Sequence, residues 1–211
     1  MYLCRLFLNA GEPSVRLDAA NPDGLHKTVM RLFPMNAGFE ARRVHGVLHR
    51  LEESGEGQLM LMIQSRVKPD PTNLLPGYLS ENPCIRDVSG ERQAIGAGDR
   101  FLFRLKANTT KKIRTKTGSD GRRSNGQRVP VRGDAARLEW LGRHASRSGF
   151  IFSNVRAREV QARGQTIRVA GVVFDGVLEV TDAGAFRATL EQGIGPAKAY
   201  GFGLLSIRRS I

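Results

Sequence analysis

His26 is the residue in this sequence whose chemistry best suits proton transfer. It lies on a segment that begins with Asn21-Pro22, a typical helix cap and first helical position, and that ends at Phe33-Pro34. The apolar residues between these limits recur at helical spacing, so we expect a helix with His26 on it. An imidazole titrates near neutral pH and serves as a base or an acid, each role contributing about 10²–10⁴-fold to a rate. A lone helical histidine is nevertheless more often structural or exposed than catalytic.

The other histidines carry weaker signals. His45 and His49 have the i, i+4 spacing of a helical metal pair, but the surrounding pattern favours a strand and no cysteine or acidic pair accompanies them. His144 falls late in an expected helix between Arg143 and Arg147, as a solvated residue would. No acidic cluster suggests a two-metal nuclease, and no G-x-S-x-G suggests a hydrolase elbow. We therefore expect neither a metal site nor a cofactor.

A glycine-rich segment, residues 192–205, is the most unusual local sequence. It contains Gly193, Gly195, Gly201 and Gly203 together with Lys198. Glycine lets a backbone approach a phosphate closely and point its amides at it. The segment lacks both the third glycine of G-x-G-x-x-G and the G-K-[ST] ending of a P-loop. A tight loop between helix and strand and a phosphate contact remain equal alternatives from the glycines alone.

The charge of the chain predicts a polyanionic partner. Lysine and arginine number 33 against 20 acidic residues, for a formal net charge of +13, and the basic residues form no long amphipathic helix of the kind that binds membranes. Nucleic acid is the better expectation. Candidate phosphate contacts are the basic residues of a presumed loop and two further arginines: Lys111, Lys112, Arg114, Lys116, Arg122, Arg123, Arg156 and Arg158. A charge run is usually only a solvated face, although the density here favours RNA contact. Because aromatic residues make up only 7%, recognition of a duplex stem by shape and charge is favoured over stacking on single-stranded bases.

The order of expected elements predicts an α+β fold of two tandem ferredoxin-like (RRM-like) βαββαβ modules. Strands at 2–8, 43–51, 58–66 and 100–105, the His26 helix and a weak helix at 70–79 form the first module. A short edge strand at 128–131, a helix at 134–147, strands at 150–157 and 167–181, a helix at 183–190 and a strand at 202–208 form the second. A turn at Asp175-Gly176 would split the long strand. The expected divisions are an N-terminal domain 1–108, a basic loop or linker 109–127 and a C-terminal domain 128–211.

The expected location is the cytoplasm. The start of the chain reads as a strand and not as a signal peptide, and no stretch approaches 18 apolar residues. Cys4 and Cys84 form neither a C-x-x-C pair nor a disulfide framework.

Several ordered motifs resemble the CasE endoribonucleases of subtype I-E CRISPR systems, members of the RAMP superfamily. They include FRLKAN at 103–108, RVP at 128–130 leading to LEWL at 138–141, VFDGVLEV at 173–180, GIGPAK at 193–198 and GFGLLS at 201–206. The Met1-Tyr2-Leu3 start and the His26 helix agree as well. The match is collinear over nearly the full length.

The resemblance implies an enzyme that cuts precursor CRISPR RNA at the 3′ base of the repeat hairpin. Cleavage would proceed by attack of a 2′-hydroxyl, without metal, and leave a 2′,3′-cyclic phosphate. The enzyme would stay on the guide RNA together with the other Cascade subunits. His26 matches the family's catalytic histidine, Arg31 matches a phosphate-assisting cation, and Lys27 is its neighbour. Lys106 in FRLKAN and the glycine-rich segment would add RNA contacts.

One position departs from the family pattern. The family typically has Tyr-x-x-His, whereas this sequence has Asp23-Gly24-Leu25-His26. The missing phenol favours an alternative function, that of a non-catalytic RNA-binding subunit of the same fold retained for assembly.

Overall fold

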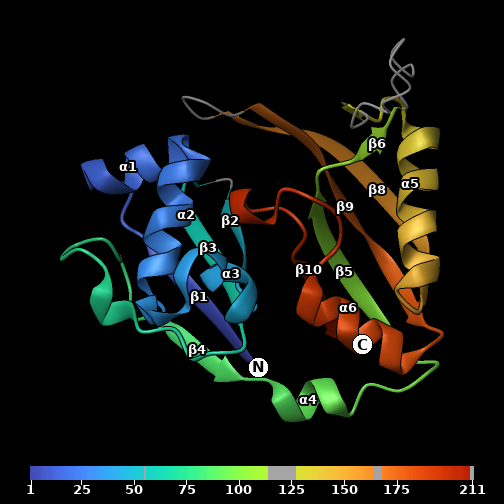
Figure 1. The fold of residues 1–211 in the computed structure, drawn as a ribbon, viewed down its shortest axis with the longest axis horizontal. Coiled ribbons are helices and arrows are strands. Elements are labelled where there is room, and N and C mark those ends of the chain that lie inside the picture. Colours follow the sequence, from blue (N-terminus) through green and yellow to red (C-terminus); the bar gives the residue numbers. More distant parts are fainter. Residues whose placement is uncertain (55, 114–126, 164–167, 210–211) are drawn as a thin grey trace, which may run out of the picture.

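Two four-stranded antiparallel sheets form the framework of the computed structural model, which describes residues 1–54, 56–113, 127–163 and 168–209 (Figure 1). The first sheet, in the order β2-β3-β1-β4, contains β1 (Tyr2–Leu8), β2 (Leu48–Glu53), β3 (Leu59–Ser65) and β4 (Cys84–Asp87). The second, in the order β10-β5-β9-β8, contains β5 (Arg100–Ala107), β8 (Phe150–Arg163), β9 (Arg168–Val180) and β10 (Leu205–Arg209). Counted within its own module, each sheet has the same order: fourth, first, third, second. The predicted α+β fold of two ferredoxin-like modules is confirmed.

Helices cover one face of each sheet. In the first module these are α1 (Pro13–Ala20) and α2 (Pro22–Arg31), followed by the short helices η1 (Met35–Glu40), α3 (Ala41–Val44) and η2 (Pro71–Asn73). In the second module α5 (Asp134–Arg147) and α6 (Ala183–Gln192) pack on the sheet, and η3 (Lys198–Tyr200) precedes β10. The short helix α4 (Ser89–Gln93) links the modules. Within the described ranges, no helix is long and apolar enough to cross a membrane.

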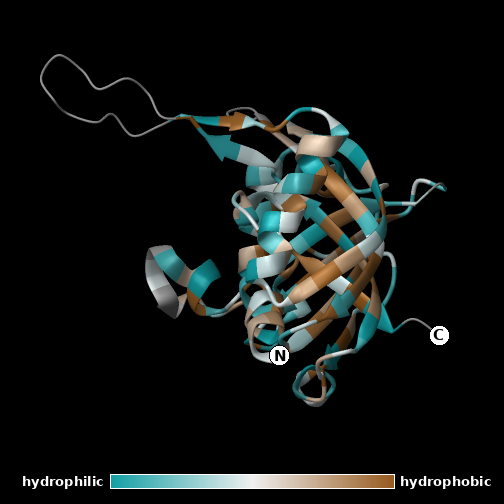
Figure 2. Ribbon diagram, turned by 90° about the vertical axis from the view of Figure 1, so that its right-hand side faces the viewer, coloured by the Kyte–Doolittle hydropathy of each residue, from teal (hydrophilic) through white to brown (hydrophobic). Residues whose placement is uncertain are grey.

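Each module has its own hydrophobic core, built by alternation along the strands. On β1 the buried residues are Cys4, Leu6 and Leu8, which pack with Leu25 and Val29 of α2. On β5 every second residue, from Phe101 to Ala107, enters the other core. Figure 2 shows the resulting alternation of hydrophobic and hydrophilic residues along the strands. The two-residue period of a strand therefore separates a core face from a polar face in both sheets.

The prediction that residues 100–105 end the first module is wrong. The strand exists, but β5 pairs with β9 and β10 of the second sheet, so the modules meet at the α4 linker and not at residue 108. Consequently the strand expected at 128–131 is not the first strand of the second module. It is β7 (Arg128–Pro130), which pairs with β6 (Thr110–Lys112) in a separate two-stranded ribbon. Alternation identifies a strand but does not say which sheet it joins.

Smaller differences have local causes. Residues 41–44 form α3, so β2 starts later than expected, and α1 was not predicted. Only 71–73 of the expected weak helix at 70–79 is helical. β9 runs without a break through Asp175-Gly176, and the irregularity lies opposite, between Ser153 and Arg156 of β8. A side chain on Gly176 would come within 2.8 Å of Val155, so this glycine accommodates the bulge.

Candidate active site

His26 is held on the flank of α2 that faces η3. The helix starts where the Asn21 side chain accepts a hydrogen bond from the Asp23 amide at 3.2 Å, with Pro22 as its first residue. Leu25 anchors the helix in the core beside the half-buried His26. Burial and the nearby charge of Arg42 lower the pKa of His26, and Asp23 opposes this shift.

A second histidine, His49 on β2, lies against His26. The two rings are stacked, with centroids 6.3 Å apart and planes 19° from parallel. His49 is completely buried, and neither of its ring nitrogens has a hydrogen-bond partner within the described part of the chain. Burial lowers its pKa to about 3, helped by the charges of His26, Lys106 and Arg42. His49 is therefore a neutral imidazole beneath His26, and our sequence interpretation considered it only as an unlikely metal ligand.

The remaining histidines lie elsewhere. His45 caps α3, and its Nε2 lies 3.0 Å from the Pro34 carbonyl while its ring stacks on Phe33. His144 is half-buried against Trp140, with ring centroids 4.1 Å apart, so it is less solvated than expected. Over residues 1–54, 56–113, 127–163 and 168–209, no cluster of three potential metal-ligating side chains occurs.

The glycine-rich segment folds into a tight loop whose glycines have positive φ. A Cβ on Gly193 would meet the Gly203 carbonyl at 2.7 Å, one on Gly203 would meet the Ile194 carbonyl at 2.9 Å, and one on Gly195 would meet Trp140 at 3.2 Å. Close packing thus accounts for these three glycines. Contact of their backbone with a phosphate stays a prediction.

The loop also covers the two histidines. Its helix η3 packs against α2 and β2, and a Cβ on Gly201 would lie 3.7 Å from Cδ2 and Nε2 of His49. Gly201 and Tyr200 line a cavity of about 360 Å³, with Leu25 of α2 and Lys106 of β5 on other walls. The predicted RNA-binding loop and the predicted catalytic helix are therefore neighbours, although most of the chain separates them.

Three half-buried cations lie around His26 and His49. Lys106 lies 5.0 Å from the centre of the Phe202 ring, and Lys198 lies against Gly203. Arg42 on α3 donates a hydrogen bond to the Val47 carbonyl at 3.2 Å. Burial lowers the pKa of all three groups. Lys106 and Lys198 were predicted to bind RNA, whereas Arg42 was not singled out.

Other predicted residues are more dispersed. Lys27 and Arg31 are exposed on α2, and the charge of Arg31 acts on Tyr78. Lys111 and Lys112 are exposed on β6, whereas Arg114, Lys116, Arg122 and Arg123 fall outside the described residues. No contact between Arg31 and His26 supports the expected pairing, and the role of Arg31 stays a prediction.

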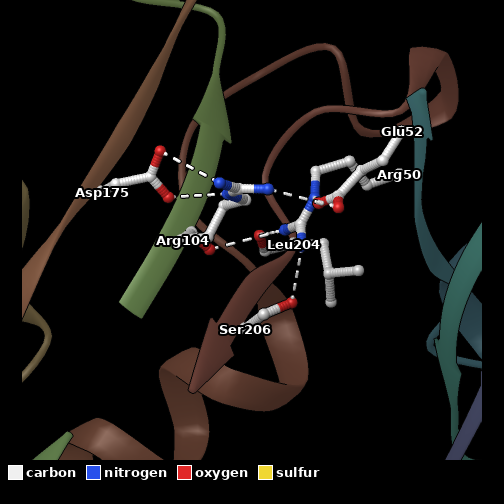
Figure 3. Close-up of polar contacts among 6 residues, drawn as sticks. All are labelled: Arg50, Glu52, Arg104, Asp175, Leu204 and Ser206. Carbon is white, nitrogen blue, oxygen red and sulfur yellow. Dashed lines mark hydrogen bonds and ion pairs between the residues drawn. The ribbon is translucent and has the colours of Figure 1, made fainter. Parts of the chain in front are cut away.

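Arg50 of β2 ties the two modules together (Figure 3). Only 4% of its side chain is exposed. Its Nε donates to Glu52 at 2.6 Å, Nη1 donates to the Leu204 carbonyl at 3.1 Å, and Nη2 donates to the Ser206 hydroxyl at 3.0 Å. The first sheet is thereby fixed to β10, the strand that follows the glycine-rich loop.

Arg104 of β5 extends this network on the open side (Figure 3). It donates to both oxygens of Asp175, at 2.6 and 3.3 Å, and to Glu52 at 3.3 Å. These residues line a cleft of about 870 Å³ between the sheets, where the exposed Arg156 also lies. Arg158 instead lies where its charge acts on Lys106. The two predicted arginines of β8 thus belong to different surroundings.

We expect His49→Phe to make stability less sensitive to acid. His49 has a pKa of about 3 in the folded protein against 6.5 when unperturbed, so below pH 6.5 the unfolded chain binds a proton that the folded one rejects. Stability from this group is complete above pH 6.5 and is lost as the pH falls toward 3. Urea unfolding at pH 7.5 and pH 5 should show a loss about 2 kcal/mol larger in the wild type than in His49→Phe. Equal losses in both proteins would contradict the burial of a neutral His49.

This chain is similar to known proteins over nearly its full length. A family of CRISPR-associated proteins matches residues 1–209. The CRISPR-associated endoribonuclease Cse3 of Thermus thermophilus is 31% identical over 98% of this chain and 99% of its own length. The Cascade subunit CasE of Escherichia coli is 33% identical over 51% of this chain and 57% of its own length. The structure of Thermus thermophilus Cse3 bound to an RNA representing a pre-cleavage complex has a TM-score of 0.81 at 30% identity and covers 98% of both chains.

These matches confirm the resemblance indicated by the ordered motifs. The family match and the Thermus thermophilus matches extend from β1 to β10 and include both sheets and the loop beside His26. The chain belongs to the family of CRISPR-associated proteins, and within that family it is of the CasE type.

Proposed function

We propose that this protein is an endoribonuclease that cuts precursor CRISPR RNA at the 3′ base of the repeat hairpin and then stays on the guide RNA as a Cascade subunit. The observation that carries the proposal is the position of His26, beside a glycine-rich loop and among half-buried cations. A full-length relative is named an endoribonuclease, and another relative is named a Cascade subunit.

Cleavage by the RNA's own 2′-hydroxyl requires two proton transfers. The 2′-oxygen forms a bond to phosphorus and gives its proton to a base, while the bond from phosphorus to the 5′-oxygen breaks and that oxygen takes a proton from an acid. The products are a 2′,3′-cyclic phosphate and a 5′-hydroxyl. His26 suits the transfer of one of these protons. Its lowered pKa leaves it neutral at pH 7 in the RNA-free protein and able to accept a proton.

The basic residues of the chain supply the positive charge that the phosphate needs. Lysine and arginine neutralise the phosphate while an imidazole moves the proton, so the proposed reaction needs no metal ion. Exposed basic residues away from His26, such as Lys27, Lys111 and Lys112, would contact the backbone of the hairpin stem.

The alternative is a non-catalytic RNA-binding subunit of the same fold. Asp23 favours it, because this carboxylate stands where the family typically has a phenol. The two functions can be distinguished, because an endoribonuclease and a non-catalytic subunit would both bind the repeat hairpin but only the endoribonuclease would cut it.

Incubation with the repeat RNA of its own locus in EDTA tests the proposal. We expect a single cut at the 3′ base of the hairpin, with a 2′,3′-cyclic phosphate on the upstream product and a 5′-hydroxyl on the downstream one. The ends are read by sensitivity to acid and by labelling with polynucleotide kinase. RNA that is bound tightly but stays intact would support the assembly subunit, and a cut that requires Mg²⁺ would contradict the proposed chemistry.

A further inference from the structure

Two consecutive arginines of α3 have opposite environments. Arg43 is turned outward, with 74% of its side chain exposed, and pairs with Glu40 at 2.6 Å. Arg42 is half-buried, and its only hydrogen bond within the described part of the chain goes to the Val47 carbonyl. Arg42 is therefore a cation partly withdrawn from water without a carboxylate partner.

The charges around Arg42 are also positive. Its hydrogen bond to the Val47 carbonyl places Arg42 two residues from His49, whose ring stacks on that of His26. The charge of Arg42 acts on His26, on His49 and on Lys198, while Lys106 acts on His49 from the other module. In the described residues, no carboxylate lies within ion-pair distance of Arg42, Lys106 or Lys198.

The acidic groups whose charges act on Lys106 and on His26 do not cancel the charge of this cluster. Glu52 attracts Lys106 but is already bound by Arg50 and Arg104. Asp23 attracts His26, yet its effect is smaller than those of burial and Arg42. Burying cations without a counter-charge is unfavourable, and a bound anion removes that penalty. The cluster is thus suited to an anion lying next to His26.

We infer that Arg42 binds the scissile phosphate of the RNA and neutralises the charge that this phosphate gains as the 2′-oxygen attacks. Lys106 and Lys198 face the same phosphate from the second module. This inference rests on the proposed function and names the residue that holds the reacting group. Arg42 stays protonated throughout, so it moves no proton and its contribution is electrostatic.

Arg31 is less well placed for this role. It follows His26 by five residues, and successive helical residues turn by about 100°, so the two side chains leave α2 about 140° apart. Arg31 is exposed and acts on Tyr78, while Arg42 acts on both histidines. A phosphate beside His26 is therefore near Arg42, on α3, and away from Arg31.

Binding of a non-cleavable RNA isolates this contact. A repeat hairpin with a 2′-deoxy nucleotide at the cleavage site is prepared with either a normal phosphate or an uncharged methylphosphonate at the scissile linkage. Wild-type protein should bind the uncharged RNA roughly tenfold more weakly. Arg42→Gln should bind the two RNAs within about twofold of one another, because it has lost the cation that distinguishes them. Arg43→Gln is the matched control and should discriminate as the wild type does. Arg31→Gln tests the competing assignment and should also discriminate if Arg42 is the residue that holds the phosphate.

Cleavage of the unmodified hairpin completes the test. Arg42→Gln should cut about 10²–10³-fold more slowly under single-turnover conditions, and Arg42→Lys should restore part of the rate. Arg42→Met, which keeps the unbranched stem, replaces Arg42→Gln in both assays if the melting temperature shows that the latter does not fold.

The outcomes separate this inference from the proposed function. If Arg42→Gln discriminates between the charged and the uncharged RNA as the wild type does, or if Arg31→Gln loses this discrimination instead, the assignment of Arg42 is overturned. Cleavage by the wild type would still uphold the proposed endoribonuclease. A wild-type protein that neither cuts nor discriminates overturns both.

Discussion

Replacing His26 with alanine is expected to abolish cleavage of the repeat hairpin and to leave hairpin affinity nearly unchanged. One neutral imidazole contributes little to binding compared with many lysine and arginine contacts, but its proton transfer is needed only in the transition state. The cleavage rate should therefore fall by at least about 10²–10⁴-fold.

Single-turnover cleavage and equilibrium binding, measured on the same RNA, check this expectation. Lys27→Ala is the matched control, because Lys27 is the next residue of α2 and is exposed. It should affect affinity modestly and the rate of the bound RNA little. A His26→Ala protein that cuts at the wild-type rate would rule out the assignment, and one that also fails to bind would indicate a role in folding.

Replacing Arg50 with methionine should produce the largest loss of stability. The guanidinium is nearly inaccessible, and its removal leaves the Leu204 carbonyl without its donor and Glu52 with Arg104 as its remaining cation. Each buried polar group that is left without its partner costs about 1–3 kcal/mol, and several hydrogen bonds are lost together here, so we expect a total loss of about 3 kcal/mol.

Urea unfolding gives the measurement, with Arg100→Met as the control. Arg100 pairs with Glu179 at 3.6 Å, but 63% of its side chain is exposed, so its loss should cost no more than about 1 kcal/mol. Similar losses in the two variants would show that the Arg50 network contributes no more than a surface ion pair.

Elements with local signals were predictable from the sequence. The cap at Asn21 and the periodicity after it located α2, and the helix expected at 134–147 coincides with α5. The pairing of β5 was not predictable in this way, because the choice of a sheet depends on contacts with β9 and β10, which come much later in the chain. The same limit explains why β7 was placed in the second sheet.

The candidate site shows the same division. Family resemblance singled out His26, Lys106 and Lys198, and the structure brings them to one place. His49 was missed because a single histidine on a strand gives no pattern of its own. The sequence also does not show that its ring stacks on His26. Arg42 was missed because its neighbour Arg43 has the same charge, and only the fold distinguishes the inward side chain from the outward one.

The position of β5 and η3 in the second module has a consequence for biosynthesis. The ribosome makes α2 with His26 early, when β5 with Lys106 and the loop with Lys198 do not yet exist. A nascent chain that carries only the first module therefore holds the imidazole but neither of these cations nor the loop that covers His49. We therefore expect cleavage competence to arise late in translation, when η3 docks on α2, and half-made chains to leave RNA near the translating ribosome uncut.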